Sequence, residues 1–147
     1  MLENSGANNN WARFYVANST GHLRIYTDDT TSHIGFFDDA SGVYSATSDR
    51  RLKEDFEPLP FDWNTFMELQ PLTYQYRTDD SAKRHIGMVA QDVEQVYPEL
   101  ITHDSESDIY HMNYSGIGVV AVKALQEQRK EHETLKKQVQ EKDLEIQ

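Results

Sequence analysis

The sequence predicts an α+β protein with a β-structured segment first, a small mixed α/β domain next, and one long helix at the C-terminus. Short aromatic and alternating runs separated by turn residues fill the N-terminal part, a pattern typical of strands. No proline follows Asn113, which favours an uninterrupted final helix. A chain of 147 residues has room for one modest domain and its extensions. We therefore predict three parts, at residues 1–47, 48–115 and 116–147.

Composition excludes several classes of function. Eight Tyr, six Phe and two Trp supply enough apolar surface for a core, although only 37% of the residues are hydrophobic. The net charge of -11 results from 25 acidic residues against 14 basic ones. Binding to nucleic acid requires a basic surface that neutralises phosphates, and anionic membranes attract basic segments in the same way. We therefore expect no nucleic acid and no membrane as partner.

The sequence has no cysteine, which excludes disulfides, thiolate metal sites and cysteine nucleophiles. The first residues lack the basic and apolar regions of a signal peptide, and no apolar run approaches the roughly 18 residues that span a bilayer. The six histidines show no metal-ligand spacing. His103, Asp104, Asp108 and His111 could chelate an ion, but we interpret them as part of an acidic surface loop. We expect no metal and no cofactor.

Residues 1–47 predict short strands divided by turn signals such as Asn18–Gly21. Strands this short and this few do not bury a core alone. We therefore expect these residues to form one part of a β-structured stalk, which upstream sequence or other subunits complete. The expected strands are residues 11–16, 22–27, 33–37 and 42–44.

The middle part predicts a compact domain of alternating helices and strands. Asp62 is a candidate N-cap for a helix with apolar residues at helical spacing, and Pro71 stops that helix. The expected elements are a helix over residues 62–69, strands over 72–77, 85–90 and 109–112, a helix over 91–97, and an acidic loop over 103–108.

The last part predicts one long helix that begins at Asn113 or Ser115. An isolated helix this polar is marginal in water, so it needs partners, and a parallel homo-oligomer is the simplest source of them. The alternative is a solvated tail that frays past about Lys130. The coiled-coil heptad places Leu125, His132, Val139 and Ile146 at position a, and Ala121, Gln128, Leu135 and Lys142 at position d.

Four phrases of the sequence resemble a known family when they are taken together. They are Ser48–Lys53 (SDRRLK), Leu69–Tyr76 (LQPLTYQY), His85–Leu100 (HIGMVAQDVEQVYPEL) and the helix entry Tyr114–Gln128. In this order and spacing they are similar to the endosialidase-type intramolecular chaperone domain. That domain ends many phage tailspikes and tail fibres, and it recurs in a membrane-tethered myelin transcription factor of animals.

The resemblance implies a chaperone that cuts its own chain between Thr47 and Ser48, with Ser48 as nucleophile and Lys53 as base. It implies a homotrimer whose partners are its own copies and the upstream fibre segment of the same chain. Such a domain templates the folding of the fibre and then releases itself. The expected location is a virion tail fibre precursor assembled in the host cytoplasm.

The implied chemistry is physically reasonable. A serine hydroxyl can attack the preceding carbonyl through a five-membered ring, so the backbone itself supplies proximity. A lysine serves as base only after its ammonium loses a proton, which burial and nearby cations favour. Arg50 and Arg51 are candidate cationic neighbours. Ser48 and Lys53 do not share one face of a regular helix, whereas a turn leading into a helix could bring them together.

Three alternatives stay open at this point. Residues 48–53 could be a solvated linker in which Ser48 or Asp49 merely caps a helix. His85 could support the reaction, or it could be a structural histidine at a strand start. The whole domain could be a non-cleaving structural cap that trimerises a fibre. A processed transcription-factor fragment, like the animal relative, disagrees with the acidic charge.

Overall fold

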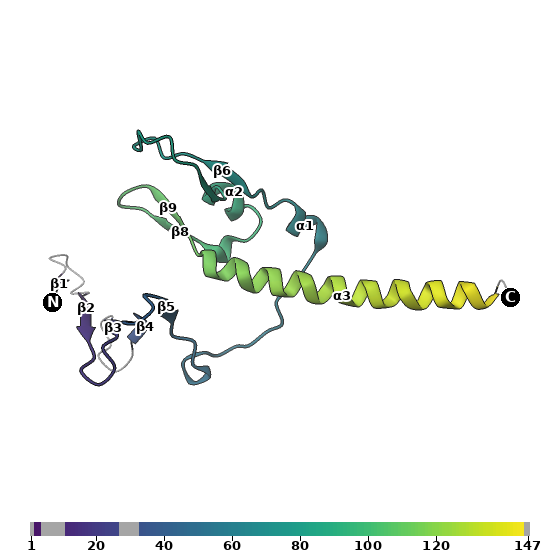
Figure 1. Cartoon of the computed structure of the whole chain (residues 1–147), viewed down its shortest axis with the longest axis horizontal. Helices are drawn as coiled ribbons and strands as arrows, with labels where there is room; N and C mark the ends of the chain where they lie inside the picture. Colours follow the sequence, from purple (N-terminus) through teal and green to yellow (C-terminus); the bar gives the residue numbers. More distant parts are fainter. Residues whose placement is uncertain (1, 4–10, 27–32, 146–147) are drawn as a thin grey trace. The chain divides into compact units, whose positions relative to one another are not determined.

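The computed structural model describes residues 2–3, 11–26 and 33–145. The chain divides into two compact units, residues 1–57 and 58–147. Small antiparallel sheets and one long C-terminal helix make up the described chain, so the predicted α+β class is confirmed (Figure 1). The predicted three-part division stays a prediction.

The first unit contains a five-stranded antiparallel sheet whose strands follow one another in sequence order. These strands are rich in aromatic and aliphatic residues, and the predicted strands over residues 11–16 and 33–37 are confirmed. The strands are β1 (Leu2–Glu3), β2 (Trp11–Val16), β3 (Leu23–Tyr26), β4 (His33–Phe37) and β5 (Tyr44–Ala46).

The last strand of this sheet begins later than predicted, at Tyr44 instead of Gly42. Gly42 has a φ of 70° and closes the turn after β4, where its N–H donates to the Asp38 carbonyl at 2.8 Å. A residue in this left-handed conformation cannot begin a strand, so β5 starts only after the turn.

Little of the first unit is buried. Ala17, with 4% of its surface exposed, is the one fully buried apolar side chain among the described residues of this unit. Phe14, Ile34 and Tyr44 are 50%, 48% and 44% exposed, although they lie on strands. A sheet of this kind leaves apolar surface available on both faces.

The second unit combines short helices, two two-stranded ladders and the long helix α3. Asp62 caps α1 by accepting a hydrogen bond from the Thr65 N–H at 2.8 Å, as predicted. Strand β6 pairs antiparallel with β7, and β8 with β9. The elements are α1 (Trp63–Met67), β6 (Leu72–Tyr74), β7 (His85–Gly87), α2 (Ala90–Glu94), the 3-10 turn η2 (Pro98–Leu100), β8 (Ile101–Asp104), β9 (Ile109–Met112) and α3 (Tyr114–Glu145).

Several elements of this unit are shorter than the sequence predicts. The strand expected over 85–90 stops at Gly87, because the Val89 carbonyl accepts the N–H groups of Asp92 and Val93 and so begins α2. The helix α2 accordingly covers residues 90–94 and not 91–97. The expected acidic loop was also too long, since His103 and Asp104 belong to β8 and pair with β9.

The core of the second unit lies where α2, η2 and α3 meet. Val93, Leu100 and Val120 are 2%, 9% and 5% exposed, and larger apolar side chains pack around them. Gly116 allows α3 to lie close to η2, because a Cβ at this position would collide with the side chain of Leu100. The core is therefore small and is completed by the first turns of the long helix.

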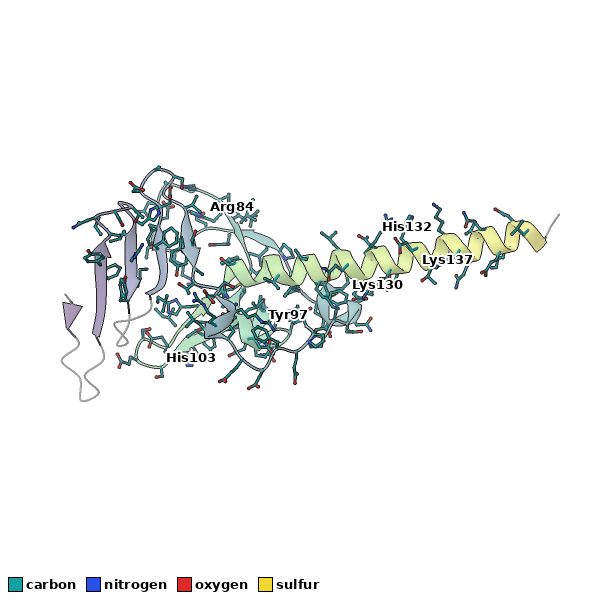
Figure 2. The ribbon with its side chains drawn as sticks, turned by 90° about the horizontal axis from the view of Figure 1, so that it is seen from below. Arg84, Tyr97, His103, Lys130, His132 and Lys137 are labelled. Atoms are coloured by element: carbon teal, nitrogen blue, oxygen red, sulfur yellow. The ribbon has the colours of Figure 1, made fainter. Side chains whose placement is uncertain are left out.

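The helix α3 extends from Tyr114 to Glu145, so the predicted long helix is confirmed. Asn113 caps it by accepting the Gly116 N–H at 3.1 Å. The indole N–H of Trp63 donates to Glu131 at 2.6 Å and fastens α1 to the middle of α3. Beyond this contact α3 extends away from the rest of its unit, with exposed side chains such as those of His132 and Lys137 (Figures 1 and 2). None of the described helices is long and apolar enough to cross a membrane.

We expect Leu100→Ala to lower the free energy of unfolding by about 2 to 5 kcal/mol, because it removes buried methyl groups from a small core. Urea denaturation followed by circular dichroism measures the change. Leu144→Ala is the matched control, since Leu144 is 73% exposed and its loss should change stability by less than about 0.5 kcal/mol. Equal effects of the two substitutions would contradict the assignment of this core.

Candidate functional site

Ser48 and Lys53 lie in hydrogen-bond contact. The Lys53 ammonium donates from Nζ to Ser48 Oγ at 2.8 Å. Both residues belong to the first unit, so this geometry comes from one compact part of the chain. A hydroxyl and an amine at this distance can exchange a proton, which is the first requirement for an activated serine.

A single turn of 3-10 helix brings the two side chains together. The turn η1 covers Arg50–Leu52, and its closing bonds run from the Leu52 N–H to the Asp49 carbonyl and from the Lys53 N–H to the Arg50 carbonyl. Ser48 precedes this turn and Lys53 follows it in extended conformation, so the chain reverses between them. The sequence predicts that a turn leading into a helix could bring the two residues together, whereas the structure has a single 3-10 turn followed by extended backbone.

Asp49 stabilises this turn as its N-cap. Its carboxylate accepts the Arg51 N–H at 2.8 Å and also binds the Arg51 guanidinium, from Nε at 3.0 Å and from Nη2 at 2.7 Å. The hydrogen bonds from Arg51 lower the pKa of the Asp49 carboxyl below its ordinary value. The cap that the sequence analysis treated as an alternative to chemistry therefore coexists with the Ser48–Lys53 contact.

The bond between Thr47 and Ser48 begins where the sheet ends. The Thr47 N–H donates to the Ile34 carbonyl at 2.9 Å, which continues the β4–β5 ladder by one residue beyond Ala46. The sheet therefore holds the residue before the bond, and the η1 turn holds the residue after it. Neither Ser48 nor Lys53 is buried in the single chain.

The two arginines of the motif have partners of their own. Arg51 is paired with Asp49, which raises the pKa of its guanidinium. Arg50 stacks over the ring of Phe56, 4.5 Å from the ring centroid. Their predicted role as cationic neighbours of Lys53 stays a prediction.

His85 lies on β7 in the second unit, within an aromatic cluster. Its ring stacks on Tyr74 at 5.7 Å and meets Tyr76 edge-on at 5.0 Å. Its buried Nε2 has no hydrogen-bond partner and lies 3.9 Å from a carboxylate oxygen of Asp79. These contacts give His85 a packing role within its unit, and its predicted role beside Ser48 stays a prediction.

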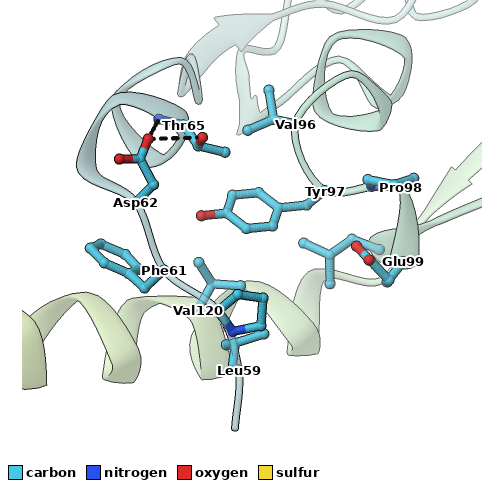
Figure 3. A pocket seen from close by; sticks show the side chains of 11 residues that line it. Leu59, Phe61, Asp62, Thr65, Val96, Tyr97, Pro98, Glu99 and Val120 are labelled. Atoms are coloured by element: carbon cyan, nitrogen blue, oxygen red, sulfur yellow. Dashed lines mark hydrogen bonds between the residues drawn. The ribbon is translucent and has the colours of Figure 1, made fainter. Parts of the chain in front are cut away.

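A separate apolar pocket of about 390 Å³ lies in the second unit between α1, η2 and α3 (Figure 3). Tyr97 lies across it, and burial together with the charge of Asp62 raises the pKa of its phenol. The Asp62 carboxylate is occupied in capping α1. The lining therefore offers apolar contact and no pair of groups arranged for proton transfer.

The four residues named as possible chelators belong to the β8–β9 hairpin, with His103 and Asp104 on β8, Asp108 in the turn and His111 on β9. His103 Nε2 contacts Asp108 Oδ1 at 2.8 Å, and Asp104 accepts hydrogen bonds from Glu106 and Ser107. These carboxylates are used to shape the turn. Within residues 14–26 and 34–144, the grouping that could hold a metal is a different one, formed by His22, Asp38 and Asp39.

The β-structured segment, the small α/β domain and the long helix together define an α+β domain with a Ser–Lys contact beside a strand end. Residues 48–102 match the family described as the chaperone of endosialidase, whose model also carries a peptidase name. This match covers the first three of the four sequence phrases and confirms the resemblance to that family.

A named relative is the long tail fiber protein Gp37 of Salmonella phage S16, which is 31% identical over 105 residues. The alignment covers 66% of this chain and 14% of the relative, so the chain spans a small part of that protein's length. No solved structure matches the chain.

We expect the Asp49 carboxyl to titrate below the ordinary value of 3.8, as followed by NMR of its side-chain carbon. Because its pKa is lowered in the folded state, Asp49 stabilises the turn above pH 3.8, and this stabilisation is lost as the pH falls through the lowered pKa.

Arg51→Gln should raise the midpoint of the Asp49 titration, because it removes the guanidinium that contributes most to the lowering of the Asp49 pKa. Arg50→Gln is the matched control and should leave the midpoint unchanged, since Arg50 stacks on Phe56. An equal shift in both variants would show that general charge, and not the pairing with Arg51, lowers the pKa.

Proposed function

We propose that this chain is an intramolecular chaperone at the end of a phage tail fibre, and that it releases itself by cutting the Thr47–Ser48 bond. The observation that carries the proposal is the 2.8 Å contact from Lys53 Nζ to Ser48 Oγ beside that bond. The match of residues 48–102 to the chaperone-of-endosialidase family and the similarity to a phage long tail fibre protein support the role.

The proposed reaction uses Ser48 as nucleophile and Lys53 as base. Lys53 in its neutral form takes the hydroxyl proton, and Ser48 Oγ attacks the Thr47 carbonyl carbon. The peptide C–N bond breaks, its nitrogen receives the proton from Lys53, and an ester joins Thr47 to Ser48 Oγ. Water then hydrolyses the ester and leaves a Thr47 carboxylate and a free amino group on Ser48. Proximity within one dipeptide lowers the entropic part of the barrier.

Assembly would switch this reaction on. An amine gives up its proton more readily where its charged form is removed from water, whereas Ser48 and Lys53 are exposed in the single chain. Neighbouring subunits that cover the η1 turn would supply the burial that the chemistry requires. Arg50, Arg51 and His85 are the supporting groups that we propose to test after the pair itself.

We propose a homotrimer built on a parallel coiled coil of α3. Leu125, Leu135 and Val139 lie at the seam positions of the heptad and are 65%, 59% and 57% exposed. Pairs such as Arg129 with Glu133, 2.6 Å apart, satisfy charges within the helix and leave the apolar stripe to a partner.

The trimer would align three copies of the upstream fibre in register. Contacts between different chains stabilise the fold only after the chains have associated. A trimerising domain raises the effective concentration of the chains. Cutting after the fibre has formed removes the template and leaves the product kinetically trapped. The fibre precursor would be assembled in the host cytoplasm, and the chaperone domain would leave it after cleavage.

We expect Ser48→Ala to abolish cutting and Lys53→Ala to slow it by about 100- to 10,000-fold, the range in which a general base contributes. Mass spectrometry of freshly expressed protein measures the fragment that begins at Ser48. Lys83→Ala, which removes another exposed lysine, is the matched control and should cut as the wild type does. An intact wild-type chain at all times would instead support the non-cleaving structural cap.

We expect Leu135→Asp to reduce the native mass from three chains to one, because a trimer would have to bury three carboxylates at the seam. Native mass spectrometry measures this, and the monomeric variant should also cut more slowly. Leu144→Asp is the control, since Leu144 is also exposed to solvent but lies outside the a and d positions. A monomer that cuts at an undiminished rate would refute the dependence on assembly.

A further inference from the structure

His22, Asp38 and Asp39 form a compact group of metal-ligating side chains at one end of the first unit's sheet. The register of β3 and β4 pairs Leu23 with Phe37, so His22 falls opposite Asp38 just beyond the last pair. His22 Nδ1 lies 3.6 Å from Asp38 Oδ2 and 3.3 Å from Asp39 Oδ1. One ligand atom of each residue lies within 4.8 Å of the others.

The imidazole nitrogen in this group is unsatisfied. His22 Nδ1 is buried and has no hydrogen-bond partner, and the two carboxylate oxygens lie beyond the usual N–H···O range of about 2.7 to 3.2 Å. The ion pairs of the described residues give Asp38 and Asp39 no lysine or arginine partner. Two carboxylates and one ring nitrogen therefore converge on a point where a positive charge would satisfy all three.

We propose that His22, Asp38 and Asp39 bind a divalent transition-metal ion such as zinc. Metal–ligand bonds of about 2.0 to 2.2 Å place neighbouring ligand atoms roughly 3.0 to 3.5 Å apart, and the two distances from His22 Nδ1, 3.6 and 3.3 Å, are close to this range. An imidazole ligand favours zinc and related ions over magnesium and calcium, which prefer oxygen ligands only. Water would complete the coordination.

The surrounding residues orient these ligands. The His22 ring stacks on Phe36 at 4.6 Å, and Asp38 Oδ1 accepts two hydrogen bonds from Ser41, at 2.8 Å from N and 2.7 Å from Oγ. Asp38 Oδ2 is thereby left to face His22. Gly21 has a φ of 73°, and a Cβ at this position would collide with the Asp39 carboxylate, so glycine leaves room for that side chain. Ligands held in this way bind a metal with little reorganisation.

The three residues all precede Thr47. The site would therefore remain with the N-terminal product if the chain is cut, and binding does not depend on cutting.

Isothermal titration of the full chain with zinc chloride, after treatment with EDTA and gel filtration, tests the proposal. We expect one zinc ion per chain, and separate titrations with calcium and magnesium should show weaker binding. His22→Phe keeps the stacked ring but removes the nitrogen, so it should lose zinc binding. Asp39→Asn, at a side chain that is 55% exposed, removes a charge without disturbing the fold and should lose it as well.

His103→Phe is the matched control. The His103 ring is also stacked, on Tyr110 at the same interplanar angle of 19° as His22 on Phe36, but it faces a single carboxylate. This variant should bind zinc as the wild type does. Zinc should raise the melting temperature of the wild type and of His103→Phe, but not that of His22→Phe.

Three results would overturn the proposal. They are no zinc binding by the wild type, binding retained in both His22→Phe and Asp39→Asn, or an equal loss in His103→Phe.

Discussion

Many large apolar side chains of the described residues are exposed in the single chain. Hydrophobic burial is the main force that stabilises a fold. The five-stranded sheet leaves Phe14 and Ile34 about half exposed, and α3 leaves Leu125 and Val139 exposed along the heptad seam. On α3 these residues recur at heptad positions, whereas on β2 three consecutive side chains, Phe14, Tyr15 and Val16, are exposed. Copies of the same chain can cover apolar surface of both kinds, and the proposed trimer would do so.

The same constraint governs the chemistry that we propose. The η1 turn places Lys53 Nζ against Ser48 Oγ without help from another chain, so geometry is supplied locally. The single chain does not bury the site, because Ser48 and Lys53 are both exposed. In the proposed mechanism, the geometry would be present from the start and burial would follow only on assembly, so assembly would control the reaction. An early cut would leave the chains without a template, and this arrangement opposes it.

The sequence could predict what depends on local pattern and could not predict what depends on pairing between distant strands. Caps at Asp62 and Asn113 follow from residue type, and they are observed. The exact turn that joins Ser48 to Lys53 could not be derived from periodicity, because a five-residue separation fits no regular face. The meeting of His22 with Asp38 was missed altogether. It depends on the β3–β4 register, and no spacing motif in the sequence signals it.

The position of the proposed cut is itself explained by these local structures. Thr47 is held by its hydrogen bond to Ile34 in the sheet, whereas Asp49 caps a turn that is closed entirely by residues after the bond. Hydrolysis of the Thr47–Ser48 bond would break the covalent connection and leave both sets of hydrogen bonds in place. The sheet would keep its last ladder bond and the turn would keep its cap. Cutting at this peptide would therefore cost the folded fibre little, while it would separate the fibre from the domain proposed to align its chains.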